Sequence, residues 1–375
     1  MRNLGQELRV AILGCGFWSR FQIPAWLELP NVRCLAVCDW SAERAEATAR
    51  RFHIPRFYGD ASDLMANEKA DVVDIITSPD THRDLVLLAA SHRTPVICQK
   101  PMAGDFATAK EMVRVCRDAG IPFFVHENWR WQRPIRRLKG VLESGEIGRP
   151  FRARIDFNTS FPVFKNQPFL RELDELIVMD LGSHILDVAR FLFGEAQSVY
   201  CLLERIHPDI RGEDVATILL RMRDGTSVAC NLSFASRSEI ERFPETYFFV
   251  EAEQGSVTLG PDFWIRVITE NGTRVRRYPS PVYSWADPNY ALVQASIVEC
   301  HRNLRQGLEQ QGKAETTAED NLRTMELVFA SYRSAQTGDV VHIYPNEPGL
   351  AEFPANRGTH SRTNTGPHSG ADAYS

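Results

Sequence analysis

The sequence predicts an α/β protein with two domains, a doubly wound parallel sheet followed by a second α/β domain with a mostly antiparallel sheet. Three observations support this prediction. The chain has 375 residues, enough to bury two separate cores. Short runs rich in Val and Ile alternate with helical patterns through the first 130 residues, which is typical of a parallel sheet covered by helices. From Pro150 to about Tyr278 the strand patterns are longer and are joined by hairpin signals.

The first domain, residues 1–130, is expected to contain five strands separated by helices. In the helical segment DFATAKEMVRVCRDAG, Asp105 is placed to cap the start of a helix and Gly120 to end it. The five strand patterns are LRVAILG (8–14), VRCLAVCD (32–39), DVVDIITSP (71–79), PVICQKP (95–101) and PFFVHEN (122–128).

The second domain is expected to span residues 131–345. Its strand patterns are FRARIDFNTSF, SVYCLLERI, DVATILLRMR, TSVACNLSF, TYFFVEAE and RVRRYP, with hairpin signals such as RDGT and ENGT between them. The helical pattern DLGSHILDVARFLFG interrupts them early, and two further helices are expected around residues 287–311 and 316–336. Residues 346–375 are polar and rich in Gly, Pro, Ser and Thr, so this tail is expected to be disordered.

Composition excludes several classes of protein. Hydrophobic residues make up 43% and charged residues 24%, as in ordinary soluble proteins. The net charge of −5 and the lack of a basic block argue against nucleic acid as a partner. No run approaches the ~18 apolar residues of a membrane span. The eight cysteines contain no Cys-x-x-Cys pair and no zinc-ligand spacing, which predicts reduced thiols, a cytoplasmic location and no bound metal.

A glycine-rich turn follows the first strand. In GCGFWS, Gly14 would permit a tight turn and Gly16 a close approach of the backbone to a pyrophosphate, while Ser19 stands where the dinucleotide fingerprint has its third glycine. Asp39 ends the second strand, where an acid would bind the adenine ribose and repel the 2′-phosphate of NADP. These features predict NAD as the cofactor, with Trp40 stacked on the adenine; the alternative for Asp39 is a helix cap, a role for which Ser41 competes.

Polar residues end each strand of the predicted parallel sheet. They are Gly14–Gly16, Asp39, Ser78–Pro79, Lys100 and Asn128. Ligands bind at the carboxyl ends of such strands, so all of these residues are expected to face one crevice. Lys100 precedes a proline and therefore belongs to the extended end of its strand. A lysine there either extends into solvent or points into the crevice, and the other strand ends favour the crevice.

A second polar group lies in the helical pattern VMDLGSHILDVARFLFG. Asp180 and His184 are four residues apart and share one face if the helix already includes Asp180. An aspartate can fix the tautomer of a histidine and raise its basicity, as a base that deprotonates a hydroxyl requires. The alternative is that Asp180 caps the helix and His184 is a satisfied histidine of the core.

Taken together, the motifs resemble the Gfo/Idh/MocA family, the glucose–fructose oxidoreductase and inositol dehydrogenase group. The resemblance covers Leu8 to about Ile343 and is carried by AILGCGFWS, TSPDTHRDLVLLAA, QKP, HENWRW, DLGSHILD and TAEDNLRTMELVFASYRSAQTGDVV. It implies a Rossmann domain, then an α/β domain with a large open sheet that forms a homodimer or homotetramer. It also implies hydride transfer between a sugar or polyol carbon and nicotinamide, with Lys100, Asp180 and His184 as the catalytic residues. The sequence departs from the family at Gln99, where glutamate is usual.

The resemblance leads to a hypothesis about the reaction. His184, oriented by Asp180, removes the proton from a secondary hydroxyl, and Lys100 stabilises the developing alkoxide. An arginine beside the pocket, Arg130, would suit the carboxylate of a sugar acid. The residues expected to bind the cofactor are Gly14, Gly16, Phe17, Trp18, Asp39, Trp40, Ser78, Pro79, His82, Gln99, Lys100, Asn128 and Trp129, and those expected to bind the substrate are Lys100, Trp129, Arg130, Gln132, Asn158, Gln167, Asp180 and His184.

The substrate prediction rests on the closest branch of the family. HENWRWQRPIRRLKGVLESGEIG and DLGSHILDVARFLFGE look most similar to the D-apionate oxidoisomerases, which oxidise a branched sugar acid. An inositol-type or aldose dehydrogenase is the alternative within the family, because members share a fold and vary in substrate. A non-catalytic NAD-binding sensor is the alternative of another class, although it would have no use for Lys100, Asp180 and His184 together.

Overall fold

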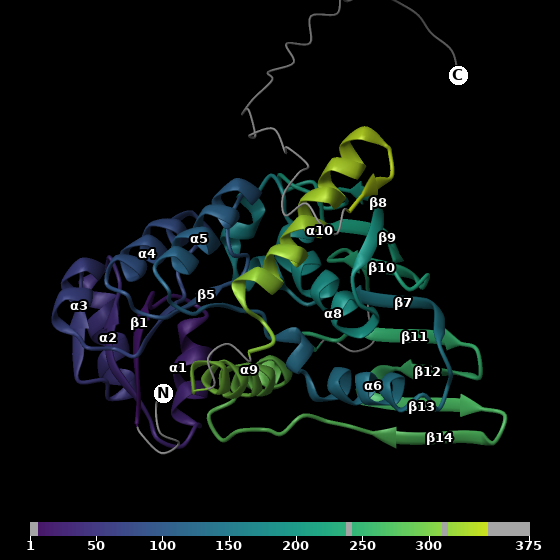
Figure 1. Ribbon diagram of the computed structural model, residues 1–375, viewed down its shortest axis with the longest axis horizontal. Helices are drawn as coiled ribbons and strands as arrows, with labels where there is room; N and C mark the ends of the chain where they lie inside the picture. The colour runs from purple at the N-terminus through teal and green to yellow at the C-terminus, as the bar shows by residue number, and fades with distance from the viewer. Residues whose placement is uncertain (1–6, 238–241, 310–313, 344–375) are drawn as a thin grey trace, which may run out of the picture.

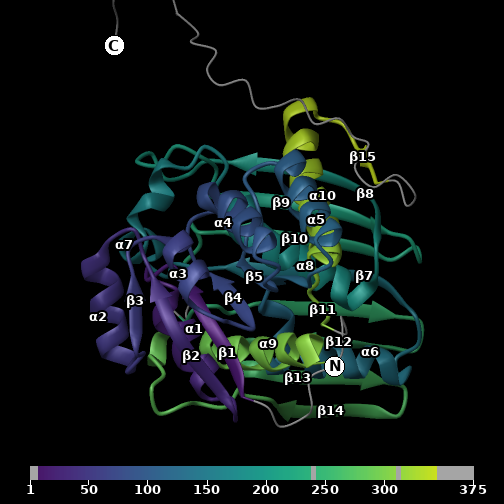
Figure 2. The same ribbon diagram turned by 60° about the vertical axis from the view of Figure 1, so that its left-hand side comes forward.

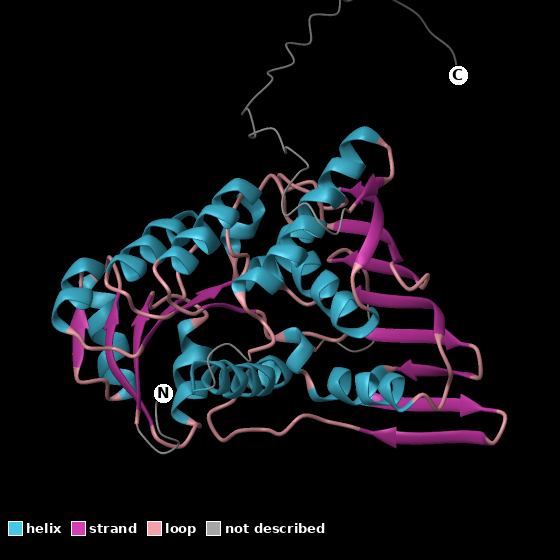
Figure 3. Ribbon diagram, viewed as in Figure 1, coloured by secondary structure: helices cyan, strands magenta, loops and turns pink. Residues whose placement is uncertain are grey.

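The computed structural model describes residues 7–237, 242–309 and 314–343. Within these ranges the chain forms two sheets with helices packed between them and along the first sheet (Figures 1 and 3). The predicted tail, residues 346–375, lies outside the described residues. None of the described helices is long and apolar enough to cross a membrane.

The first sheet is the predicted parallel one. Its six strands run in the order β3-β2-β1-β4-β5-β6, and every neighbouring pair is parallel. The short edge strand β3 was not predicted; it has three residues, too few to show a pattern. The strands are β1 (Leu8–Leu13), β2 (Val32–Cys38), β3 (Arg56–Tyr58), β4 (Val72–Ile75), β5 (Val96–Gln99) and β6 (Phe123–His126).

Helices connect these strands on both faces of the sheet. They are α1 (Ser19–Leu27), α2 (Ala42–Phe52), α3 (Ala61–Asn67), α4 (Pro79–Ser91) and α5 (Phe106–Asp118). As predicted, the Asp105 side chain caps α5 by accepting a hydrogen bond from the amide of Thr108 at 2.8 Å. This strand order reverses direction between β1 and β4, which is the point where a doubly wound sheet opens a crevice for a ligand.

The second sheet has nine strands in the order β14-β13-β12-β11-β7-β10-β9-β8-β15. Among its described pairs, β7 and β10 are parallel and the rest are antiparallel, so the predicted sheet is confirmed as mostly antiparallel. The strands are β7 (Pro150–Asn158), β8 (Ala196–Glu204), β9 (Val215–Met222), β10 (Ser227–Ser233), β11 (Tyr247–Ala252), β12 (Gly255–Leu259), β13 (Trp264–Thr269), β14 (Gly272–Arg277) and β15 (Val341–His342).

One face of the second sheet is covered by helices and the other is open (Figure 1). The covering helices are α6 (Arg133–Ser144), α8 (Ser183–Phe193) and α10 (Ala318–Thr337). Alternate residues of β9 are buried against them, for example Ile218 and Leu220, while Leu219 between them is 49% exposed. This alternation is the pattern expected of a sheet with a single buried face.

After residue 290 the chain returns to the first sheet. Helix α9 (Ala291–Glu309) lies between the two sheets beside α1, as Figure 2 also shows, and His301 stacks on Trp26 with 3.9 Å between ring centroids. Further on, the carbonyl of Thr316 accepts a hydrogen bond from the amide of Val125 at 2.9 Å. Part of the predicted second domain therefore packs on the first sheet, and the boundary at residue 130 stays a prediction.

Candidate active site

The glycine turn after β1 has room for a ligand. Gly14 has a φ of 107°, and a Cβ atom there would lie 2.7 Å from the carbonyl oxygen of Ile76, so only glycine fits. At Gly16 a Cβ would meet no atom within 4 Å, which leaves the backbone of the turn open to a pyrophosphate. Ser19, in place of a third glycine, is buried at the start of α1 and donates a hydrogen bond to the carbonyl of Gly16 at 2.7 Å.

Asp39 braces this turn from the end of β2. Its carboxylate accepts hydrogen bonds from the amides of Cys15 at 2.9 Å and Ser41 at 3.0 Å. The Ser41 side chain caps α2, so Asp39 is not the cap of that helix. Trp40 is 84% exposed, and the Arg44 guanidinium lies 5.4 Å from the centre of its ring. The aromatic surface beside Asp39 is therefore available to an adenine.

Of the residues predicted after β4, Ser78 and Pro79 lie at the carboxyl edge of the sheet, but His82 is buried away from it. Ser78 and Pro79 form the start of α4, at the carboxyl edge of the sheet as predicted. His82 is fully buried, and its ring nitrogens each lie 3.1 Å from a backbone carbonyl, those of Met102 and Thr77. His82 therefore braces two loops and has no ring nitrogen left for a cofactor, contrary to the prediction.

Lys100 points into the crevice. Its side chain is only 9% exposed, and Nζ donates hydrogen bonds to Oδ1 of Asp180 at 2.7 Å and to the carbonyl of the same residue at 2.8 Å. The side-chain oxygen of Gln99 accepts a hydrogen bond from the backbone amide of Lys100 at 2.7 Å. A glutamate at position 99 could accept that bond equally well, so the departure from the family pattern costs no contact here.

Asp180 lies in a π-helical turn, Val178–Gly182, that leads into α8. Two buried side chains hold the start of this turn. The carboxylate of Glu213 accepts hydrogen bonds from the amides of Leu176 and Val178, and the Tyr332 hydroxyl accepts one from Met179 at 3.0 Å. The wider turn directs Asp180 toward Lys100, so the predicted hydrogen-bonded pair of Asp180 and His184 does not form.

His184 is held instead by two residues of the HENWRW motif. Its Nδ1 is hydrogen-bonded to Oε1 of Glu127, and its ring stacks on Trp129 with 4.5 Å between centroids and 7° between planes. Burial raises the pKa of Glu127 to about 7, against the opposing charge of Lys100. Burial and the charge of Lys100 both lower the pKa of His184, which favours the neutral imidazole.

Arg130 does not reach the pocket. Its guanidinium is buried and forms an ion pair with Asp187, Nε lying 2.7 Å from Oδ2, and Nη2 also lies 2.9 Å from Asp320. The side chain therefore links α8 to α10 and has no donor directed at a substrate carboxylate. This corrects the prediction, in which Arg130 lay just beyond the strand pattern 122–128 and was expected to face the ligand.

One pocket collects most of the residues that were predicted to bind the substrate. Asn128, at its edge, donates a hydrogen bond to the Ser296 hydroxyl at 2.6 Å. Of the predicted residues, Gln132 is buried outside the pocket and Asn158 pairs with Ser233 in the sheet, so neither lines it. The pocket is lined by Trp18, Gln99, Lys100, His126, Asn128, Trp129, Val163, Gln167, Asp180, Leu181, His184, Phe234, Phe243, Val293 and Ile297.

Two kinds of site residue were not predicted from the sequence. Glu127 was given no role within the HENWRW motif, although it directly follows β6, where a parallel sheet presents ligand-binding groups. The apolar walls carry no sequence signal and come from the short helix α7 (Val163–Asn166), from loops and from α9; they are Val163, Phe234, Phe243, Val293 and Ile297. No group of three His, Cys, Asp or Glu residues in the described parts of the chain could hold a metal ion.

Hydride transfer from a hydroxyl carbon to NAD requires a place for the cofactor beside groups that can bind and deprotonate the hydroxyl, and the open glycine turn and the pocket with Lys100 and His184 provide them. The chain is an NAD-dependent oxidoreductase that acts on CH–OH groups. Residues 8–127 match the model "Oxidoreductase family, NAD-binding Rossmann fold" and residues 135–258 match the "GFO/IDH/MocA C-terminal domain". The chain therefore belongs to the Gfo/Idh/MocA family, and the predicted family and cofactor are confirmed.

Two similar proteins are named D-apiose dehydrogenase. The chain is 41% identical to a D-apiose dehydrogenase of Rhizobium rhizogenes over 90% of this chain and 98% of the relative. It is 40% identical to a D-apiose dehydrogenase of Paraburkholderia graminis over 95% and 94% of the two chains. A crystal structure of an oxidoreductase from Agrobacterium radiobacter in complex with NAD+, L-tartaric acid and magnesium superimposes with a TM-score of 0.88 at 40% identity, covering 90% of this chain and 98% of that one.

Proposed function

We propose that this enzyme oxidises a hydroxyl of D-apiose or a closely related branched sugar. The observation that carries the proposal is the pair of relatives named D-apiose dehydrogenase, each at least 40% identical over at least 90% of the chain. The pocket supports a neutral substrate. Among the described residues that line the pocket, Lys100 is the only lysine or arginine, and its positive charge is already paired with Asp180. Arg130, which had favoured a sugar acid, is withdrawn from the pocket by Asp187 and Asp320.

The residues of the site have separate roles in the proposed reaction. Bound NAD supplies the hydride acceptor, with Gly14, Gly16 and Asp39 placed to hold it. The substrate hydroxyl lies between His184 and Lys100. Neutral His184 takes the hydroxyl proton on Nε2, and Lys100 donates a hydrogen bond to the oxygen as its negative charge develops. The wall of apolar side chains excludes water, which strengthens both interactions.

D-Apionate remains the competing substrate, since the sequence favoured a sugar acid and a related structure contains L-tartaric acid. The two are separated by following NADH formation with D-apiose, D-apionate, myo-inositol and common aldoses at equal concentrations. We expect the highest kcat/KM with D-apiose and NADH in stoichiometric amount. A higher kcat/KM with D-apionate would replace the proposal by the sugar-acid reaction. Product analysis in that assay shows whether oxidation is accompanied by rearrangement.

Asp39 is expected to set the preference for NAD over NADP. Two backbone amides hold the Asp39 carboxylate at the end of β2, so it cannot turn away from a 2′-phosphate. We expect the repulsion to make the binding free energy of NADP about 2–3 kcal/mol less favourable than that of NAD. Asp39→Ala should weaken NAD binding and improve NADP binding, which narrows the gap in kcat/KM. Steady-state kinetics with both cofactors measure this, and Glu43→Ala on the following helix, α2, serves as the control. Equal use of NAD and NADP by the unmodified enzyme would contradict the assignment.

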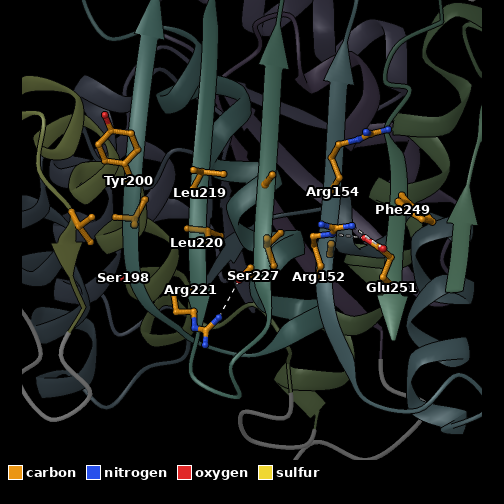
Figure 4. A pocket seen from close by; sticks show the side chains of 15 residues that line it. Arg152, Arg154, Ser198, Tyr200, Leu219, Leu220, Arg221, Ser227, Phe249 and Glu251 are labelled. Carbon is orange, nitrogen blue, oxygen red and sulfur yellow. Dashed lines mark hydrogen bonds and ion pairs between the residues drawn. The ribbon is translucent and has the colours of Figure 1, made fainter. Parts of the chain in front are cut away.

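The open face of the second sheet is proposed as the contact between copies of the chain. Figure 4 shows this face, where Tyr200, Leu219 and Phe249 stand beside Arg152, Arg154 and Arg221 in a shallow hollow. Leu202 and Leu219 are 55% and 49% exposed, which a second copy would cover. Light scattering should give a dimer or tetramer mass for the unmodified chain and a lower mass for Leu219→Glu. An unmodified chain of monomer mass would overturn this.

The cytoplasm is the proposed location. All eight cysteines are buried and free, and burial raises the pKa of several of them, for example Cys15 to about 11. Thiols of this kind suit a reducing compartment, where disulfides do not persist. Fractionation of the native host with a redox-sensitive cytoplasmic marker tests this placement.

A further inference from the structure

Glu127 is the carboxylate nearest to the proposed base. Its Oε1 is hydrogen-bonded to Nδ1 of His184 and also accepts a hydrogen bond from the amide of Trp129 at 3.3 Å. Both residues are buried, Glu127 completely, and the Trp129 ring covers one face of the imidazole. Because Nδ1 is engaged by an acceptor, only Nε2 of His184 remains for the pocket. The contact spans 57 residues of sequence and joins the end of β6 to α8.

We propose that Glu127, rather than Asp180, is the residue that positions His184 and stabilises its positive charge during turnover. The proposal rests on the proposed function, in which His184 is the base. In this arrangement the partner of His184 Nδ1 is Glu127, and Asp180 instead accepts hydrogen bonds from Lys100 through its Oδ1 and its carbonyl. The site then contains two separate pairs, Lys100 with Asp180 and His184 with Glu127.

The proton balance follows from this pairing. An ionised Glu127 accepts the Nδ1 hydrogen of neutral His184, which leaves Nε2 as the free acceptor. When the hydroxyl carbon loses its hydride and the carbonyl forms, the hydroxyl proton moves to Nε2. The imidazolium that results is stabilised by the negative charge of Glu127, and it returns the proton to solvent when the product leaves.

Other charges around the pair decide how it responds to pH. The groups whose charges act on Glu127 or His184 are Lys100 directly after β5, Arg130 beyond β6, Asp180 before α8, Asp187 on α8 and Asp320 on α10. The neutral His126 and Cys300 also interact with the pair. Removing the charge of Glu127 takes a negative charge away from the imidazole, while the positive charges of Lys100 and Arg130 stay in place. The pKa of His184 should therefore fall further, and the acidic limb of the kcat profile should move to lower pH.

Glu127→Gln tests the proposal, because the amide keeps the shape and the acceptor oxygen but not the charge. We expect kcat to fall by roughly 10²- to 10⁴-fold, the range of a general base that has lost its support, with little change in NAD affinity. Glu127→Asp, which keeps the charge, should recover part of the loss. Asp74→Asn is the matched control. Asp74 is equally buried and burial raises its pKa to about 7, but it is bonded to Trp26 and does not contact His184. That control should turn over like the parent.

The possible outcomes separate this proposal from the proposed function. If His184→Asn turns over like the parent, His184 is not the base and the proposed mechanism fails. If His184→Asn is inactive while Glu127→Gln keeps the parental kcat and acidic limb, only the role of Glu127 is overturned. Glu127→Gln combined with His184→Asn should be no slower than His184→Asn alone, because Glu127 acts through the histidine.

A measurement on the unmodified enzyme keeps the test independent of whether Glu127→Gln folds. With ¹⁵N-labelled histidine, His184 should show a protonated Nδ1 with a far-downfield proton resonance, assigned by its loss in His184→Asn. The resonance should persist in Asp180→Asn. An unprotonated Nδ1 in the unmodified enzyme at neutral pH, or loss of the resonance in a folded Asp180→Asn, would overturn the proposal.

Discussion

Replacing Lys100 by methionine is expected to reduce turnover by roughly 10²-fold or more, the scale of losing one positioned transition-state donor. Lys100 is held by Asp180 with its ammonium in the pocket, and methionine keeps much of the stem without the charge or the donors. NAD affinity and the melting temperature should stay close to those of the parent. Turnover is measured under saturating NAD, with the best substrate of the sugar panel.

The neighbouring residues sharpen the interpretation of Lys100→Met. His184→Asn should also lower turnover and should abolish the acidic limb of the pH profile, because the group that must be deprotonated is gone. The two losses should not add in the double variant if both residues act on one hydroxyl. Lys139→Met is the control: this half-buried lysine contacts Glu143 and the Leu192 carbonyl away from the pocket. If Lys100→Met turned over at the rate of the parent, Lys100 would have no role in the reaction.

Much of the fold could be predicted because its signals are local. Runs of Val and Ile such as LRVAIL, the glycine turn and the polar strand ends can each be recognised from a few neighbouring residues, as at Gly14 and Asp39. A parallel sheet then brings strand ends together without further information. Lys100 could be assigned to the pocket in this way, and the structure places it there.

The pairing of side chains could not be predicted in the same way. Four-residue spacing suggested that Asp180 supports His184, but that rule holds for a regular α-helix and Asp180 lies in a π-helical turn. The real partner, Glu127, is 57 residues away and meets His184 only because α8 packs against the end of β6. The prediction that Arg130 binds the substrate was wrong for a related reason. Its acidic partner Asp187 lies on another element, and nothing beside Arg130 in sequence indicates it.

Removal of the Arg130 guanidinium is expected to destabilise the fold more than it affects the chemistry. Arg130→Met should lower the free energy of unfolding by about 3–5 kcal/mol, since it removes the guanidinium that bonds both carboxylate oxygens of the buried Asp187 and leaves Arg190 at 4.0 Å. Urea unfolding followed by fluorescence measures this loss as a shift of the midpoint. Arg136→Met is the matched control, because its ion pair with Glu315 is half-exposed, and it should cost about 1 kcal/mol or less.

The pH dependence of Arg130→Met provides a second check. Burial already raises the pKa of Asp187 to about 6 despite the opposing charge of Arg130, and without that charge the folded-state pKa rises further. A carboxyl whose folded pKa lies above its unfolded value binds more protons when folded, so stability falls as the pH rises between the two. The stability deficit of Arg130→Met relative to the parent should therefore grow from pH 5 to pH 8.

At a temperature where Arg130→Met stays folded, its KM for either the sugar or the sugar acid should match that of the parent, because Arg130 faces Asp187 and Asp320. A raised KM for the acid alone would return Arg130 to the substrate site.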